Sequence, residues 1–408
     1  MRAAASACRN FQGSKNLHNR WGILAVLFTV RLTMAFQFQS VAAVAPLLEP
    51  KFGVNLADIG LLIGLYFTPG VALSLPGGAI GQRFGDKATV SAALTLMLIG
   101  NLVMAFSELW GVQIAGRVVA GGGGVLLNVQ MSKMVTDRFA GKEIATAMAI
   151  FINSWPAGVA LSLLTLPVVG IAYGVSAVYL AVAAMVALGI LLFVATYRPA
   201  PQATAAISAS ARLNRNTVAA VIVAGLIWGL FNTGFGIIVS FGPSLLVEHA
   251  WSITAAGSAV SIVLWLSVLS VLLGGLIADR TKRPQAVLVG CSILFALLML
   301  VLPRTGAVIA TVIGLGLISG LPAGPIMSLP AGVLKSETRA IGMGIFYTVY
   351  YGVMMLGPVI GGACAKWTGT AGAAFDFGAA VVLLCPMLLW RFNRLVAIGD
   401  HGLSETAR

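Results

Sequence analysis

The chain has 408 residues and a formal net charge of +13, yet only 9% of its residues are charged and 59% are hydrophobic. An ordinary soluble domain carries about 25% charged residues, and the mean hydropathy of +0.98 likewise excludes water as the main solvent. Segments of about 20 apolar residues can cross a bilayer core of about 30 Å as helices. Backbone groups in lipid must be paired within their own segment, so the composition predicts an all-α membrane protein.

Twelve apolar segments follow one another along the chain, separated by short polar stretches, and we expect each to be a transmembrane helix. They cover residues 21–46, 57–80, 88–107, 110–132, 144–168, 172–196, 216–242, 253–278, 284–302, 306–330, 340–364 and 371–392. The first segment is too long for a cleaved signal peptide, so we expect it to remain as the first helix.

The basic residues lie between these segments, in a pattern that indicates orientation. Twenty of the 25 Lys and Arg residues fall at the two termini, counting Arg391 at the end of the last segment, or in the loops that follow even-numbered segments, whereas the opposite loops hold only Lys51, Arg304 and Lys366. By the positive-inside rule, both termini are predicted to be cytoplasmic. The basic excess is therefore interpreted as an orientation signal rather than as a nucleic-acid surface.

The chain is expected to divide into two bundles with a linker between them. Its predicted parts are an N-terminal tail (1–20), a first bundle (21–196), a cytoplasmic linker rich in Ala, Ser and Pro (197–215), a second bundle (216–392) and a C-terminal tail (393–408). The four cysteines lie apart, three in apolar segments, so neither a metal cluster nor a disulfide framework is predicted.

A short charged loop occurs twice, which indicates a duplicated unit. The first copy runs from Gly78 through Arg83 to Lys87, and the second runs from Gly275 through Arg280. A shift of 197 residues superposes Gly78 on Gly275, Arg83 on Arg280, and also one proline at the end of segment 1 on another at the end of segment 7.

Both loops resemble the signature of major facilitator superfamily transporters, Gly-x-x-x-Asp-Arg-x-Gly-Arg-Lys/Arg, found between helices 2 and 3 and, degraded, between helices 8 and 9. They depart from it at Gln82, which replaces the acid, and at Lys282, which replaces a glycine. The resemblance implies two pseudo-symmetric six-helix bundles, secondary transport by alternating access in a bacterial inner membrane, no cofactor and no enzymatic activity. It also implies that Arg83, Asp279 and Arg280 latch the two halves together; alternatively, these charges only fix the topology.

Glycine clusters fall within several predicted helices, at 121–124, 274–275 and 357–362. Small residues let helices approach closely in lipid. The clusters are therefore interpreted either as hinges or sliding contacts for rocking, or as close packing alone.

Arg31 is the strongest candidate for a substrate-binding residue. About ten apolar residues precede it and about fifteen mostly apolar ones follow, so it should lie well inside the membrane. Its fork of donors suits a carboxylate or another oxyanion. The alternative is that Arg31 snorkels to the membrane edge or pairs with another side chain.

Arg117 lies in the sequence Arg-Val-Val-Ala-Gly, which resembles a pattern of helix 4 in the same family. Gly121, Gly124 and Asn128 fall within about 40° of Arg117 on the helix face, so one narrow stripe is polar and lined by glycine. Substrate or helix 1 could then approach the guanidinium. The alternative is that Arg117 braces helices 1 and 4 without touching substrate.

Other polar and aromatic side chains fall where the family builds its central cavity. Each is a candidate substrate contact or, alternatively, a helix-packing residue: Gln39 on helix 1, Asn128 on helix 4, Asn153 and Trp155 on helix 5, Asn232 on helix 7, and Tyr347 and Tyr351 on helix 11. The two tyrosines are one turn apart and should share a face.

The interior carries positive charge with few acids to balance it, because only Asp376 of the 12 acidic residues is clearly placed inside a segment, near its outer end, and Asp58 lies at the very start of another. The imbalance favours a small anion as substrate, an organic carboxylate or an inorganic ion, and leaves the coupling ion unspecified. We expect a monomeric carrier in the lipid bilayer with no nucleic-acid partner. The alternatives are a proton-coupled exporter of drugs or other hydrophobic compounds and, third, a transporter-like sensor without flux.

Overall fold

The computed structural model describes residues 2–74, 76–139, 144–197, 213–334 and 338–405, and these residues form helices and connecting turns without a strand. The helices are α1 (Arg2–Ala43), α2 (Ala45–Phe52), α3 (Leu56–Gly64), α4 (Thr68–Leu73), α5 (Gly77–Phe84), α6 (Asp86–Ala105), α7 (Trp110–Phe139), α8 (Ile144–Thr196), α9 (Arg215–Glu248), α10 (Ile253–Thr281), α11 (Pro284–Val301), the 3-10 turn η1 (Leu302–Arg304), α12 (Val308–Ser319), α13 (Ala323–Val333), α14 (Arg339–Thr368) and α15 (Gly372–Glu405).

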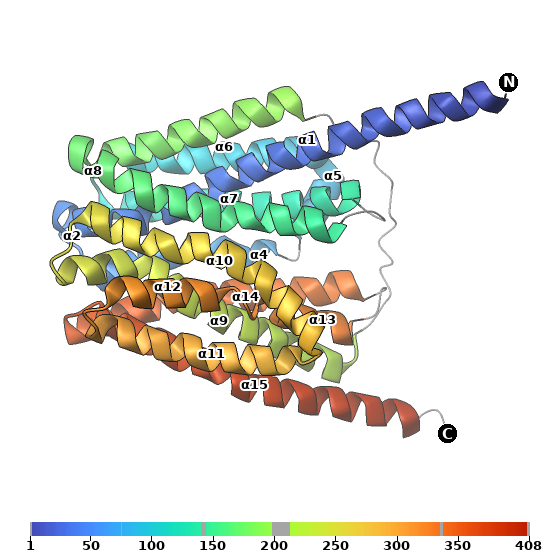
Figure 1. The fold of residues 1–408 in the computed structure, drawn as a ribbon. Helices are drawn as coiled ribbons and strands as arrows, with labels where there is room; N and C mark the ends of the chain where they lie inside the picture. The colour runs from blue at the N-terminus through green and yellow to red at the C-terminus, as the bar shows by residue number, and fades with distance from the viewer. Residues whose placement is uncertain (1, 75, 140–143, 198–212, 335–337, 406–408) are drawn as a thin grey trace.

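Twelve membrane spans result from these elements, as predicted. Within the described ranges, 11 helical segments are long and apolar enough to cross a membrane. One of them, in α8, contains two spans, because Gly174 has φ 82° and ψ 173° and interrupts the helix. Only glycine adopts this backbone region readily, so the chain reverses at Gly174 and α8 forms a hairpin (Figure 1). The all-α membrane fold class is confirmed.

The helices form two bundles that lie side by side (Figure 1). The first contains α1 to α8 and the second contains α9 to α15, and both chain ends lie on the same side of the molecule. We call this side the terminal face and the side that carries α2 the opposite face. The predicted linker falls mainly on residues 198–212, which lie outside the described residues.

Two spans are broken near their middle, and each break changes which backbone groups are paired. The second span consists of α3, α4 and α5; between the first two, the Tyr66 amide donates to the Ile63 oxygen (3.3 Å) instead of the Leu62 oxygen four residues back. The tenth span is divided into α12 and α13 before Pro322, which has no amide proton to donate. Breaks of this kind leave carbonyl oxygens free to accept side-chain donors.

The two bundles meet through glycines in the half of the molecule towards the opposite face. A Cβ atom at Gly60 of α3 would overlap the carbonyl oxygen of Pro358 on α14, and one at Gly362 of α14 would overlap the carbonyl oxygen of Leu56. On the other side of the interface, Gly257 of α10 meets the backbone of α8 in the same way. Gly362 of the cluster at 357–362 therefore packs backbone against backbone, whereas Gly357 and Gly361 face the side chains of Thr233 and Ile237 on α9.

The predicted latch is described only in part. Arg83 and Arg280 are exposed, whereas the side chain of Asp279 lies outside the described residues. Asp86, the acidic residue three positions after Arg83, is paired within the first bundle. It accepts hydrogen bonds from Gln130 (2.5 Å) and Lys133 (3.2 Å), both on α7. The latch across the two bundles stays a prediction.

Substitution of Gly60 by alanine should lower the stability of the full chain by about 1–3 kcal/mol, the usual cost of adding volume to a packed contact. The new methyl group would overlap the Pro358 oxygen, so α3 and α14 would have to separate. Gly352→Ala on α14 is the matched control, because a Cβ atom there meets no heavy atom within 4 Å. Thermal unfolding in detergent measures both; equal stability of the two variants would contradict this interface.

Candidate substrate-binding site

Arg31 lies on α1 in the interior of the first bundle, where neutral oxygens surround it. Its Nη1 donates to the carbonyl oxygens of Phe151 (2.9 Å) and Ile152 (3.0 Å) and to the hydroxyl of Ser154 (3.2 Å), all on α8. The Ile152 oxygen is available because Pro156, four residues later, has no amide proton. The sequence of α8 thus provides the acceptor that positions Arg31.

One edge of the Arg31 guanidinium stays open. The hydrogen bonds use Nε and Nη1, and Nη2 makes none with the part of the chain that the structure describes. The side chain keeps 9% of its surface accessible, although aromatic rings lie close to it. Its Cζ is 4.7 Å from the ring centre of Phe151 and 6.0 Å from that of Trp155. The group is therefore held firmly and still presents two N–H donors.

Asn128 on α7 connects Arg31 to the second bundle. Its Oδ1 accepts from the Nε of Arg31 (3.1 Å), and its Nδ2 donates to the hydroxyl of Tyr351 on α14 (3.0 Å). Both ends of the amide are used, so the chain Arg31–Asn128–Tyr351 crosses the interface between the two bundles.

Three tyrosines of α14 form the side of the site that belongs to the second bundle. The ring centres of Tyr347 and Tyr350 lie 6.5 Å and 5.1 Å from that of Tyr351, whose hydroxyl accepts from the Asn128 amide beside Arg31. Trp228 on α9 stacks on Tyr350 at 6.3 Å. Tyr350 was not among the predicted site residues, although its spacing of three from Tyr347 places both on one helix face.

Arg117 on α7 is enclosed entirely within the first bundle. Its three nitrogens donate to the carbonyl oxygens of Leu62 (3.1 Å), Gln37 (3.2 Å) and Phe38 (2.6 Å), and only 1% of its surface is accessible. The Leu62 oxygen is the one that the break between α3 and α4 leaves without its helical partner. Arg117 thus pairs the free backbone of a broken helix and ties it to α1.

The glycine stripe beside Arg117 accommodates Tyr66, which follows the same break. A Cβ atom at Gly121 would overlap the backbone of Tyr66, and one at Gly124 would overlap its hydroxyl. The ring centre of Tyr66 lies 4.6 Å from Cζ of Arg117, and its hydroxyl donates to Oε1 of Gln37 (3.3 Å). The stripe therefore faces a side chain of the second span, in the break between α3 and α4, and the sequence pattern did not single out this residue.

The remaining predicted site residues lie in different surroundings. Gln39 is fully buried and donates to the Val239 oxygen of α9 (2.6 Å), so it joins the bundles through their backbones. Asn232 donates to the Trp228 oxygen of its own helix (2.8 Å). Asn153 is half-buried on α8, and the ring centre of Trp155 lies 5.1 Å from that of Phe38.

Acidic side chains do not contact either buried arginine in the described part of the chain. Asp376 instead forms a two-pronged ion pair with Arg304, at 2.8 Å for both oxygens, between α15 and η1. No group of three potential metal ligands occurs among the described residues. The site thus consists of a cation, amide and hydroxyl groups and aromatic rings.

Twelve spans in two bundles, with a buried cation and a polar chain at their interface, define a multi-pass membrane transporter. The chain belongs to the Major Facilitator Superfamily, whose family model matches residues 27–245 and, in a second match, 217–401. The first match runs through the first bundle and into α9, and the second match covers most of the second bundle.

Curated relatives of this family are similar to the chain over part of their length. The inner membrane transport protein YajR of Escherichia coli is 25% identical over 173 residues, which cover 42% of this chain and 37% of that protein. The 2-nitroimidazole transporter of the same organism is 21% identical, covering 59% and 61%. Azole resistance protein 1 of Saccharomyces cerevisiae is 30% identical, covering 28% and 19%. Each match spans less than two thirds of the relative.

Solved structures share the fold over nearly the whole chain. A peptide transporter POT in complex with sulfate has a TM-score of 0.72 at 15% identity, covering 91% of this chain and 95% of that one. A bacterial homolog of the lysosomal transporter Spinster, inward-facing and unoccupied, has a TM-score of 0.69 at 14% identity, covering 92% and 96%. Likeness at this identity shows the fold alone.

Replacement of Arg117 by methionine should destabilise the protein by at least about 2 kcal/mol, because buried carbonyl oxygens lose their partner. Methionine keeps a long apolar stem, so the loss reports on the hydrogen bonds more than on volume. Lys366→Met, at an exposed position, is the control and should change the free energy of unfolding by no more than about 0.5 kcal/mol. Unfolding in detergent decides the matter; an Arg117 variant as stable as the control would contradict the bracing role.

Proposed function

We propose that this protein is a secondary active transporter that moves a small anion, an organic carboxylate or a small inorganic ion, across the inner membrane by alternating access, with both termini in the cytoplasm. The observation that carries the proposal is the open edge of Arg31. This guanidinium is buried and held by neutral oxygens through Nε and Nη1, and Asn128 links it to the hydroxyl of Tyr351 in the second bundle.

The charge of Arg31 is solvated by its neighbours but not neutralised. A charged residue near the centre of a membrane helix costs about 2.5–3.5 kcal/mol on insertion scales. Carbonyl, amide and hydroxyl oxygens reduce this cost, yet the net positive charge remains in a low-dielectric interior. An oxyanion bound to Nη2 and to the hydroxyls of Tyr347 or Tyr350 would supply the missing negative charge.

The position of the site supports alternating access. Arg31 belongs to the first bundle and Tyr351 to the second, and Asn128 bonds to both. A substrate that contacts both bundles would lose some of its contacts when one bundle rocks against the other. Transporters with a site between structural repeats work in this way. The close glycine contacts between α3 and α14 would have to open when the opposite face opens.

A second candidate is an exporter of drugs or other hydrophobic compounds. Two observations favour it: the relatives include an azole resistance protein, a multidrug transporter and a 2-nitroimidazole transporter, and aromatic rings surround the site. Planar hydrophobic compounds stack well on such rings. Arg31 argues for the anion, because a neutral or cationic compound would leave its charge unmatched.

Transport by purified protein in liposomes distinguishes the two candidates. A panel of organic carboxylates, inorganic anions and neutral or cationic drugs is offered to the parent protein, Arg31→Met and Lys366→Met. Lys366 is the control because it is an exposed cation on the opposite face. We expect uptake of an anion by the parent, at least tenfold slower uptake by Arg31→Met, in line with the loss of about 1.5–3 kcal/mol from bonds to a charged group, and unchanged uptake by the control.

The other outcomes are equally informative. Transport of drugs alone would contradict the anion proposal and favour the exporter. Anion uptake that survives Arg31→Met would show that the anion binds elsewhere. A parent protein that moves none of these compounds would favour the sensor without flux.

A further inference from the structure

A groove on the terminal face lies outside the proposed transport site. We call it the α11–α15 groove; it has a volume of about 340 Å³ and is lined by Gln285, Gly332, Val333, Phe392, Asn393, Val396 and Ala397. Its walls come from the first turn of α11, the last turn of α13, and α15 where that helix continues towards Glu405. A smaller hollow beside it adds Leu288, Pro325 and Leu329. None of these residues contacts Arg31 or Asn128.

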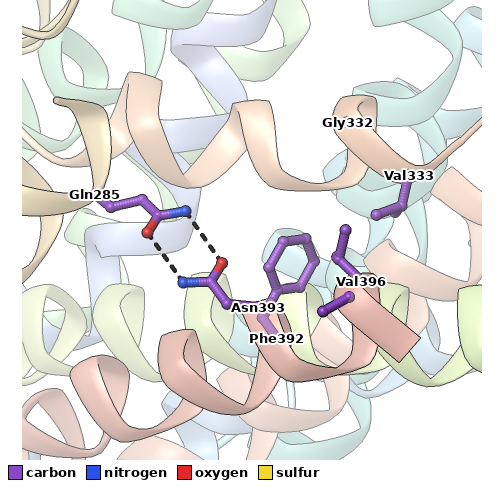
Figure 2. Close-up of a pocket in the computed structure, with 7 residues that line it drawn as sticks. Gln285, Gly332, Val333, Phe392, Asn393 and Val396 are labelled. Atoms are coloured by element: carbon purple, nitrogen blue, oxygen red, sulfur yellow. Dashed lines mark hydrogen bonds between the residues drawn. The ribbon is translucent and has the colours of Figure 1, made fainter. Parts of the chain in front are cut away.

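The groove is polar at one end and apolar at the other (Figure 2). At the polar end, the side-chain amides of Gln285 and Asn393 form two hydrogen bonds of 3.0 Å with each other, and Phe392, Val333 and Val396 lie beyond them. The surrounding helices face lipid, because large apolar side chains of α11 and α15, such as Leu297 and Met387, are more than half exposed. A molecule that enters the groove from the bilayer would contact both its polar end and its apolar end.

Cations flank the polar end on both sides. Lys282 and Arg283 precede α11, and on α15 Arg394 lies about 60° around the helix from the groove residue Ala397, whereas Arg391 lies about 160° from Asn393, on the far face; all four side chains are exposed. Neither residues 280–297 nor residues 388–397 include an acid. Cζ of Arg394 lies 3.9 Å from the ring centre of the exposed Trp390, a pairing of aromatic ring and cation that suits the level of lipid headgroups.

We propose that the α11–α15 groove binds an anionic phospholipid of the leaflet at the terminal face. Its phosphate would lie between Arg283 and Arg394, and an acyl chain would lie along Phe392 and Leu329. The charge complementarity favours an anionic over a zwitterionic lipid, since each basic residue near an anionic surface contributes about fivefold in affinity. Arginine also binds phosphate through its fork of donors.

Gly332 offers a test that leaves the charges in place. It is exposed, lines the groove, and a Cβ atom there meets no heavy atom within 4 Å, so Gly332→Leu should fill the groove without a clash. Gly290→Leu is the matched control: this glycine is equally open and exposed on α11 but does not line the groove. A second variant, Arg283→Gln with Arg394→Gln, removes charge and keeps the groove open, and Arg391→Gln, on the far face of α15, is its matched control.

Native mass spectrometry of the full-length protein in detergent, titrated with dioleoylphosphatidylglycerol or dioleoylphosphatidylcholine, measures the binding. We expect the anionic lipid to bind the parent and Gly290→Leu at least tenfold more tightly than the zwitterionic lipid. Gly332→Leu should lose this preference, and the double arginine variant should bind the anionic lipid about twentyfold more weakly. Equal binding of the two lipids by the parent, or an unchanged preference in Gly332→Leu, would overturn the proposal.

Discussion

The pairing of two buried guanidinium groups with backbone oxygens is the interaction on which the interior of the first bundle depends. In a membrane protein such oxygens are scarce, because a regular helix pairs its own carbonyl groups. Here two of the five accepting oxygens lack a helical donor: Pro156, inside α8, frees the Ile152 oxygen for Arg31, and the break at Tyr66 frees the Leu62 oxygen for Arg117. The breaks and the arginines therefore stabilise each other.

The two arginines differ in how many of their nitrogens are hydrogen-bonded, and this difference distinguishes a structural role for Arg117 from a substrate-binding role for Arg31. Arg117 donates from all three nitrogens to carbonyl oxygens and is almost inaccessible, so it ties α7 to α1 and to the broken second span. Arg31 leaves Nη2 open beside the second bundle, and Asn128 carries its hydrogen bonding on to Tyr351. The first side chain is suited to bracing, and the second is suited to an anion that both bundles can contact.

The sequence predicts the twelve spans well because apolar length and the placement of charge act locally. It also places Arg31 inside the membrane, since its apolar neighbours on both sides are visible in the chain. The hydrogen-bond partners of the arginines could not be predicted in this way, because tertiary packing decides which helix presents a free carbonyl oxygen to Arg117. Gln39 faces the α9 backbone for the same reason. Tyr66 likewise packs on the glycine stripe only because the second span breaks at that residue.

The central claim, that Arg31 holds the transported anion while Arg117 braces the fold, is tested most directly by the stabilisation that the anion confers on purified protein. A ligand present at 100 times its dissociation constant raises the free energy of unfolding by about 2.7 kcal/mol. The parent protein and Arg117→Met should both show this increase, the latter from a lower starting stability, and Arg31→Met should not. An increase that persists in Arg31→Met, or that disappears only in a folded Arg117→Met, would contradict the account.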